Sequence, residues 1–258
     1  MMRRSLIAVS SLVLALGLGA CDPTYLMRRG AEASLASIRA EALADPARPA
    51  ADRERDLARH TAETLDFTRI EPGWKVADMI IGGGYFTRVF SAAVGPRGHV
   101  TAWQPAEFIG FGADYASAIE AADAMANVDA IRSPIGAPEF PAGLDLIFTA
   151  QNYHDLHLAP FAAETAANVN AAAFRALKRG GYYVIIDHHA AAGSGLTAAN
   201  SLHRIDIEAV KREVTAAGFV LDVESDVLAN STDPMTANVF DASVRGHTSQ
   251  FMLRFRKP

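Results

Sequence analysis

The sequence has a single cysteine, Cys21, among its 258 residues, so no intrachain disulfide can form. It also lacks an excess of basic residues: 24 Lys and Arg stand against 29 Asp and Glu, which gives a formal net charge of −5. Because proteins neutralise nucleic-acid phosphates with Lys and Arg, and no basic cluster occurs along this chain, the composition does not indicate nucleic-acid binding. The apolar run near the N-terminus is shorter than the roughly 20 residues that cross a bilayer.

Residues 1–20 have the pattern of a secretory signal peptide. Two arginines precede an apolar stretch, which ends in small residues suited to cleavage. The segment Leu-Gly-Ala-Cys, ending at Cys21, resembles the lipobox of bacterial lipoproteins, in which the cysteine becomes the lipidated first residue of the mature chain. The alternative is a chance cysteine near the end of an ordinary secretory signal.

The lipobox resemblance implies a protein of the bacterial cell envelope that contacts the membrane through a lipid on Cys21 and faces the periplasm. Asp22 resembles the signal that keeps some lipoproteins in the inner membrane. Cleavage would remove two arginines and leave 22 basic against 29 acidic residues, a net charge near −7. We therefore expect an anchored, acidic chain, whose oligomeric state the sequence leaves open.

Residues 21–63 are expected to form a helical spacer. An alanine-rich helix is predicted over 28–45, and it ends where Pro46 and Pro49 break the pattern. A second helix is predicted over 50–65, and it begins with a charged first turn. Mixed charge of this kind is typical of a solvated face.

From residue 64 onward, apolar strands alternate with helices, and half of all residues are hydrophobic, 50%, which is enough for one sizeable core. The predicted strands are 74–80, 99–103, 127–131, 144–150, 182–186, 219–228 and 250–256. The predicted helices are 85–94, 108–126, 160–177 and 206–217. This alternation predicts an α/β protein with a doubly wound, mostly parallel sheet, in which ligands bind beyond the carboxyl ends of the strands.

The turn after the first of these strands is the main candidate binding site. Asp78 lies near the strand end, and Gly82, Gly83 and Gly84 open the following helix. Such a turn brings backbone N–H groups to one point and lets a ligand approach without meeting a Cβ. A tight turn without a ligand has the same pattern and remains the alternative.

Two segments resemble the class I S-adenosylmethionine (SAM)-dependent methyltransferases. Asp78, Gly82 and Gly84 fit their first motif, and Leu-Lys-Arg-Gly-Gly at 177–181 is similar to the turn before their fifth strand. The resemblance covers roughly residues 64–257 and is closest to predicted bacterial methyltransferases with a Gly-Gly-Gly-Tyr-Phe-Thr-Arg turn. It implies a Rossmann-like domain over 64–258, of about seven strands with an antiparallel C-terminal edge.

The same resemblance implies SAM as the cofactor. The implied contacts are Asp78, Gly82, Gly83, Gly84, Gln104, Ser133 and Asn152. Gln104 stands about 20 residues after the turn, where an acidic residue binds the ribose in such folds, and it can accept one hydroxyl proton or merely cap the next helix. Ile80 stands where the family has its first glycine, and we expect its side chain to crowd the methionine part of SAM.

Ionisable side chains follow the fourth and fifth predicted strands. His154 and Asp155 come after 144–150, while Asp187 and His188 come after 182–186, and these strand ends are neighbours in the expected fold. His154, Asp187 and His188 are the candidate catalytic residues, with one imidazole as the base because imidazole titrates near neutral pH. Alternatively, Asp155 and Asp187 hold a metal ion together with His188, or with His154 in its place, or the cluster only fixes loops. His157 and His203 are expected at the surface.

The sequence supports two functions. The first is an exported, lipid-anchored methyltransferase that transfers a methyl group from SAM to a small-molecule acceptor; the residues leave the acceptor undefined. The second is a non-catalytic or metal-dependent ligand-binding lipoprotein on the same fold, which Ile80, Gln104 and the cytosolic origin of SAM favour. In the resembled family a helix before the first strand often covers the cofactor, so 50–65 is a candidate lid as well as a spacer.

Overall fold

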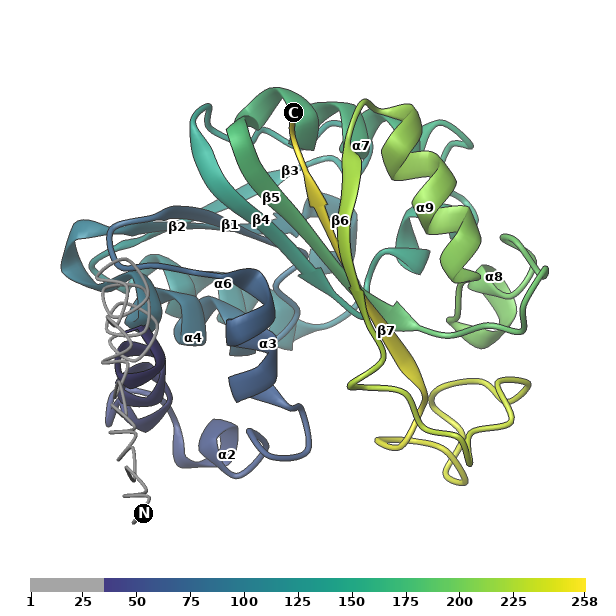
Figure 1. The fold of residues 1–258 in the computed structure, drawn as a ribbon, viewed down its shortest axis with the longest axis horizontal. Coiled ribbons are helices and arrows are strands. Elements are labelled where there is room, and N and C mark those ends of the chain that lie inside the picture. The colour runs from purple at the N-terminus through teal and green to yellow at the C-terminus, as the bar shows by residue number, and fades with distance from the viewer. Residues whose placement is uncertain (1–34) are drawn as a thin grey trace, which may run out of the picture.

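The computed structural model describes residues 35–258 (Figure 1). The predicted signal peptide, the lipidation site Cys21 and Asp22 lie outside the described residues. Within residues 35–258, no helix combines the length and the apolar character that a membrane span requires. Residues 35–44 are helical and precede the elements that carry the site.

One seven-stranded sheet forms the centre of the molecule, with the strand order β3-β2-β1-β4-β5-β7-β6. The strands are β1 Lys75–Met79, β2 His99–Pro105, β3 Val128–Ser133, β4 Leu144–Ala150, β5 Leu177–His188, β6 Val220–Ser225 and β7 Gln250–Arg256. Strands β1 to β5 pair in parallel, whereas β7 runs antiparallel to both β5 and β6. The predicted doubly wound, mostly parallel sheet with an antiparallel C-terminal edge is confirmed.

Helices cover both faces of this sheet (Figure 1). They are α2 Ala50–Arg53, α3 Thr61–Thr68, α4 Tyr85–Val94, α5 Ala106–Ile109, α6 Ala113–Asp123, α7 Thr165–Ala176, α8 Ala199–Leu202 and α9 Ile207–Ala216, with short 3₁₀ turns at Gly95–Arg97 and His154–His157. Successive strand residues point to opposite faces, so Leu146 and Phe148 of β4 pack with the core on the α4 side, whereas Ile147 packs on the α7 and α9 side. The continuous apolar run of β4 follows from this double coverage.

Two predicted helices are each divided in two. The helix expected over 108–126 is interrupted between α5 and α6 by Gly110, Phe111 and Gly112, because glycine has a low helix propensity. The helix expected over 50–65 is interrupted between α2 and α3, where His60 adopts a left-handed φ of 47°. Both interruptions place side chains beside the carboxyl ends of the strands.

The segment between β6 and β7, residues 226–249, contains no helix or strand, and it lies beyond the sheet (Figure 1). A buried ion pair fixes it: the Arg204 guanidinium donates to both carboxylate oxygens of Asp233, at 2.8 and 3.0 Å. Asp233 also accepts the backbone N–H of Ser249, and Arg204 donates to the carbonyl of His189. The segment is thereby held against the end of β5.

Candidate functional site

The carboxyl ends of β1, β4 and β5 open into a cleft with two adjoining cavities. The first, of about 390 Å³, is lined by the turn after β1 and is called the glycine-turn chamber below. The second, of about 380 Å³, is lined by the end of β5 and by Arg245, Thr248 and Gln250, and is called the distal chamber. His188 and Gln151 line both cavities, so the two share a wall.

The glycine turn leaves room for a ligand. No protein atom in the described chain lies within 4 Å of a Cβ built on Gly82 or Gly83, and both residues line the glycine-turn chamber. Gly82 and Gly84 have left-handed φ values of 54° and 75°, which glycine adopts without strain. The first N–H groups of the turn are not free, however, because Ile80 and Ile81 both donate to the carbonyl of Trp103 on β2.

Ile80 also has a left-handed backbone, with a φ of 66°, which is strained for a β-branched residue. Its side chain is 3% exposed and lines the chamber, so it occupies space beside the turn. The side-chain amide of Asn152 donates to the carbonyl of Ile80 at 3.0 Å and to that of Ala150 at 2.7 Å. Asn152 therefore ties the strained residue to the end of β4, and it lines the same chamber.

Asp78 lies beneath the turn and also lines the glycine-turn chamber. Its carboxylate accepts the hydroxyl of Thr87 at 2.6 Å. Burial raises the pKa of Asp78 to about 6, although the bond from Thr87 and the charge of Arg59 oppose the shift. This carboxyl group is therefore ionised at neutral pH at a cost in stability.

Gln104 and Ser133, two of the predicted SAM contacts, are buried and do not line the chamber. The side-chain carbonyl of Gln104 accepts the N–H of Gly82 at 3.0 Å, while its Nε2 has no partner among the described residues. Ser133 accepts the indole N–H of Trp103 at 2.9 Å. Gln104 thus holds the glycine turn against β2 and retains one unused donor.

Three aromatic residues form the wall of the glycine-turn chamber beyond β2. Phe108 and Phe111 have ring centroids 5.3 Å apart, and Tyr115 follows on α6. Phe111 is 66% exposed, which leaves a ring face available at the cleft. None of the three is among the site residues predicted from the sequence; the glycines that break the helix on either side of Phe111 were the available signal.

Asp187 connects the histidines that follow β4 and β5. It is fully buried, and it accepts the ring N–H of His154 at 2.8 Å and the backbone N–H groups of His154 and His188, each at 2.7 Å. On its other side the His154 ring lies 3.1 Å, through Nε2, from Asp155. The sequence-predicted neighbours therefore do converge.

Neither imidazole has an ordinary pKa. Burial alone would lower the pKa of His154, but the charges and hydrogen bonds of Asp187 and Asp155 outweigh burial and raise it to about 10. Burial lowers the pKa of His188 to about 4, and its Nδ1 lies 2.8 Å from the hydroxyl of Thr248. At neutral pH His154 is a cation between two carboxylates and His188 is neutral, so the expectation of titration near pH 7 is corrected for both.

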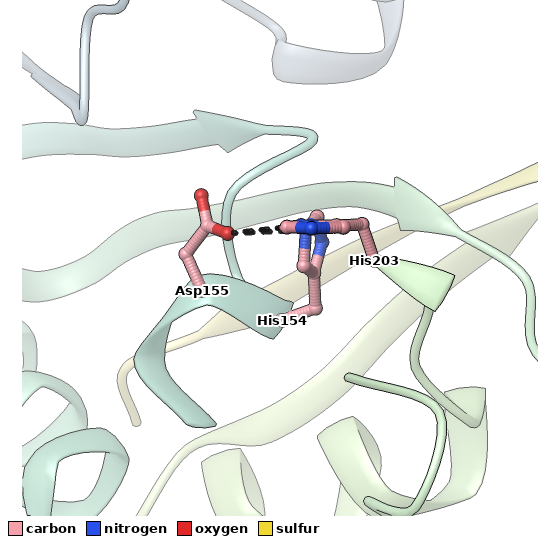
Figure 2. A group of neighbouring side chains, drawn as sticks. All are labelled: His154, Asp155 and His203. Atoms are coloured by element: carbon pink, nitrogen blue, oxygen red, sulfur yellow. Dashed lines mark ion pairs between the residues drawn. The ribbon is translucent and has the colours of Figure 1, made fainter. Parts of the chain in front are cut away.

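A cluster able to hold a metal ion is present, but its members differ from the predicted set. His154, Asp155 and His203 offer ligand atoms that lie within 4.8 Å of one another (Figure 2). His203, expected at the surface, lines the glycine-turn chamber and has a left-handed φ of 53°. Asp187 lies behind His154, and the ring of His188 is centred 6.1 Å from that of His154, so of the predicted ligands Asp155 and the alternative nitrogen ligand His154 belong to this cluster, whereas Asp187 and His188 do not.

The segment between α2 and α3 reaches the cleft. Arg55 and Arg59 line both chambers, and the Arg59 guanidinium lies 4.5 Å from the ring centroid of Tyr85. The acidic residues of this segment are paired: Asp56 binds Arg48, and Asp52 binds Arg88 of α4. The mixed charge therefore packs against the main domain instead of forming a purely solvated face.

Comparison with known proteins places this geometry in a structural class. No family model matches the chain, and no curated protein matches its sequence. Among solved structures, a SAM-dependent methyltransferase from Aquifex aeolicus superimposes with a TM-score of 0.56 over 79% of this chain and 93% of its own, at 18% identity. One from Mesorhizobium loti superimposes with a TM-score of 0.53 over 76% of this chain and 96% of its own, at 15% identity.

The chain has the class I methyltransferase fold. The sheet order, the antiparallel β7 and the flanking helices all belong to that fold. The cyclase SpnF superimposes on the chain as well, with a TM-score of 0.57 over 90% of this chain and 96% of its own, at 16% identity. Because the methyltransferase fold carries more than one chemistry, the function has to be argued from the site.

Proposed function

We propose that this protein is a SAM-dependent methyltransferase that acts on a small-molecule acceptor. One observation carries the proposal: a single cleft joins the open glycine turn after β1 to the imidazole and carboxylate groups after β4 and β5. The glycine-turn chamber, at about 390 Å³, lies within the range of roughly 300–1,000 Å³ that is usual for ligand pockets. The distal chamber lies across the shared wall and is the place for the acceptor.

The residues of the glycine-turn chamber fit SAM. The turn has open space over Gly82 and Gly83, and Gln104 holds it in this form by accepting the N–H of Gly82. The exposed ring of Phe111 suits stacking on a purine. Ile80 reduces the space beside the turn, so we expect weaker binding than a glycine there would permit.

When bound, SAM supplies an electrophilic methyl group. His188 lies in the wall shared by both chambers and is neutral at pH 7, so its Nε2 can accept a proton from the acceptor when Nδ1–H donates to Thr248. Asp187 is a positioning residue that holds the backbone of His188 and the ring of His154. Because a pKa of about 4 makes His188 a weak base, most of the acceleration would come from alignment of the two reactants in the cleft.

Calorimetric titration of the purified chain with SAM and with its demethylated product tests this function. We expect heat from both ligands, and a loss of affinity of about tenfold, or about 1.4 kcal/mol, in Gly83→Val, which places methyl groups over the turn. Ala167→Val, on an exposed position of α7, adds two methyl groups away from the cleft and should bind normally. No heat with either ligand at sub-millimolar concentration would exclude the enzyme.

The cluster in Figure 2 favours a second function, ligand binding through a divalent metal without group transfer. Two imidazoles and one carboxylate are a ligand set used for zinc and for non-haem iron. The bond from His154 Nδ1–H to Asp187 matches the outer carboxylate that commonly orients a metal-binding histidine. A protonated His154 held between Asp155 and Asp187 would make the same contacts, so a measurement of bound metal has to distinguish the two functions.

Elemental analysis of the protein purified without added metal separates the two functions. Metal-dependent binding predicts about one equivalent of metal, lost in His203→Ala and retained in His99→Ala, whose imidazole lies at the amino end of β2. A metal-free protein that still binds SAM would reject metal-dependent ligand binding and retain the methyltransferase.

We also propose that the chain is exported and anchored in the cell envelope through a lipid on Cys21, facing the periplasm from the inner membrane. The lipobox-like segment and Asp22 support this location. Growth with a radiolabelled fatty acid should label the wild-type protein but not Cys21→Ser. An unlabelled protein that retains residues 1–20 would contradict export by this route.

A further inference from the structure

The distal chamber has an unusual balance of charge for an acidic chain. Three arginines line it, Arg55, Arg59 and Arg245, and among the described residues no aspartate or glutamate does. The whole chain, in contrast, has a formal net charge of −5. Guanidinium groups gathered around a cavity without carboxylates create a local positive potential, which favours an anionic ligand.

The guanidinium groups of these arginines have no ion-pair or hydrogen-bond partner among the described residues. Within residues 35–258, no ion pair and no side-chain hydrogen bond involves Arg55, Arg59 or Arg245, although five other arginines are paired with carboxylates: Arg39, Arg48, Arg88, Arg204 and Arg254. Two aspartates of the segment between α2 and α3 and its flanking helix, Asp52 and Asp56, are already bound to Arg88 and Arg48. The guanidinium donors at the cleft therefore remain available to a ligand.

Arg59 is the best placed of the three. Its guanidinium lies 4.5 Å from the ring centroid of Tyr85 and 5.0 Å from that of Phe86, so aromatic rings position the group while its N–H donors stay free. Burial and the like charge of Arg55 lower the pKa of Arg59, and the charges of Asp78 and Asp52 offset only part of this cost of burying the cation. An anion in the chamber would relieve this cost.

The remainder of the chamber wall is largely apolar. Phe86, Ile186, Leu228 and Val239 contribute hydrocarbon surface. The nearby amides of Gln151 and Gln250 bond to each other at 3.0 Å, and Thr248 bonds to His188, which leaves few polar groups for a sugar or a peptide. At about 380 Å³ the chamber suits a small molecule with an apolar body.

We propose that the distal chamber binds a small amphipathic acid, whose carboxylate or phosphate is held by Arg59 together with Arg55 and Arg245 and whose apolar body lies against Phe86 and Ile186. The inference rests on the proposed function only where it takes this ligand to be the methyl acceptor. In that role, the acid lies beside the wall that His188 shares with the glycine-turn chamber. The chemical class of the acceptor is thereby defined as an anionic aliphatic or aromatic compound.

Four small-molecule probes, including an acid and its neutral amide of the same shape, test whether binding requires a negative charge. Calorimetric titration of the purified chain would compare 4-phenylbutanoate, the neutral 4-phenylbutanamide, and phenyl phosphate, with inorganic phosphate as the probe without an apolar body. We expect both amphipathic acids to bind, the amide and inorganic phosphate to bind at least about tenfold more weakly, and the affinity of the acids to fall as salt is raised. Equal binding of 4-phenylbutanoate and its amide would overturn the proposal.

Matched variants test the location. Arg59→Met keeps a long apolar stem on the two rings but removes the charge, and we expect it to lose about tenfold in affinity for the acid and nothing for the amide. Arg179→Met removes the same charge from an exposed position at the other end of β5 and should change neither. If Arg59→Met does not fold, Arg245→Met in the 226–249 segment replaces it. Equal acid binding by the Arg59 and Arg179 variants would place the acid elsewhere.

SAM titrations in the same samples distinguish the two proposals. Binding of the acids without binding of SAM retains the distal chamber and rejects the methyltransferase. Binding of SAM with no preference for acids retains the methyltransferase and rejects an anionic acceptor.

Discussion

The Nδ1 atom of His154 lies 2.8 Å from one carboxylate oxygen of Asp187, while the other oxygen accepts the backbone N–H of His154 at 2.7 Å. The two residues follow neighbouring parallel strands, β4 and β5, whose register pairs Ala150 with Ile186. One fully buried carboxylate therefore fixes both the backbone and the ring of the same histidine. The other ring nitrogen, Nε2, is left facing Asp155 and the cleft.

Replacing Asp187 with Asn should destabilise the protein by about 3 kcal/mol at pH 7, because a buried cation then loses its charged partner. His154 has its folded-state pKa raised from 6.5 to about 10, so its stabilisation is complete below pH 6.5 and is lost as the pH rises through 10. Urea denaturation should therefore show the deficit of Asp187→Asn at pH 7 and a smaller deficit above pH 10. A deficit independent of pH would contradict the assigned ion pair.

Replacing Asp78 with Asn should have the opposite effect on stability. Burial raises the folded-state pKa of Asp78 from 3.8 to about 6, so its contribution favours the folded state below pH 3.8 and is lost as the pH rises through 6. Asn can still accept the hydroxyl of Thr87, and we expect Asp78→Asn to be about 1–3 kcal/mol more stable than the wild type at pH 8. The two proteins should converge near pH 4.

The same Asp78→Asn protein should bind SAM more weakly, because the carboxylate lines the glycine-turn chamber. A charged residue kept in the cleft at a cost in stability is a common feature of functional sites. A variant that gains stability and keeps full affinity for SAM would show that Asp78 has no part in binding.

Replacing Ile80 with Gly should widen the glycine-turn chamber. The substitution relieves the left-handed backbone strain but removes a buried side chain, and we expect a net loss of about 1–3 kcal/mol in stability. Affinity for SAM should rise if the Ile80 side chain crowds it. Ile119→Ala, which shortens a buried side chain of α6 that does not line the chamber, serves as the control in calorimetry and thermal denaturation. A fall in affinity would show that the ligand uses the Ile80 side chain.

Replacing Asp233 with Asn should release the 226–249 segment. The buried Arg204 would lose its bidentate partner, which costs about 3–5 kcal/mol. Hydrogen exchange should accelerate across this segment, and binding in the distal chamber should weaken, because Val239, Arg245 and Thr248 line that chamber. Asp241→Asn, an exposed change in the same segment, should leave both measurements unchanged.

The parts of the fold that depend on local sequence could be predicted. Strands 144–150 and 250–256 and the helix 85–94 have the expected bounds, because apolar runs and glycine stops are local signals. Gly110 and Gly112 indicate a loosened helix, but the full break between α5 and α6 was not predicted because the helical pattern resumes beyond it. The convergence of His154 with Asp187 followed from the order of parallel strands, which the alternation of strands and helices indicates.

The parts of the site that depend on distant contacts could not be predicted. His203 and Arg59 carry no local signal of function, and they reach the cleft because α8 and the segment before α3 pack over the strand ends. The opposite pKa shifts of His154 and His188 arise from which ring contacts the carboxylates and which is only buried. Side-chain burial and pairing of this kind are set by tertiary packing, so spacing along the chain does not reveal them.

Photo-crosslinking of SAM carrying a radioactive methyl group, followed by peptide mapping, tests the central claim most directly. The account predicts label within residues 78–84 or 108–115, and its loss when the demethylated product is added in excess. Label confined to other segments, or label that the product does not displace, would contradict a SAM site at the glycine turn.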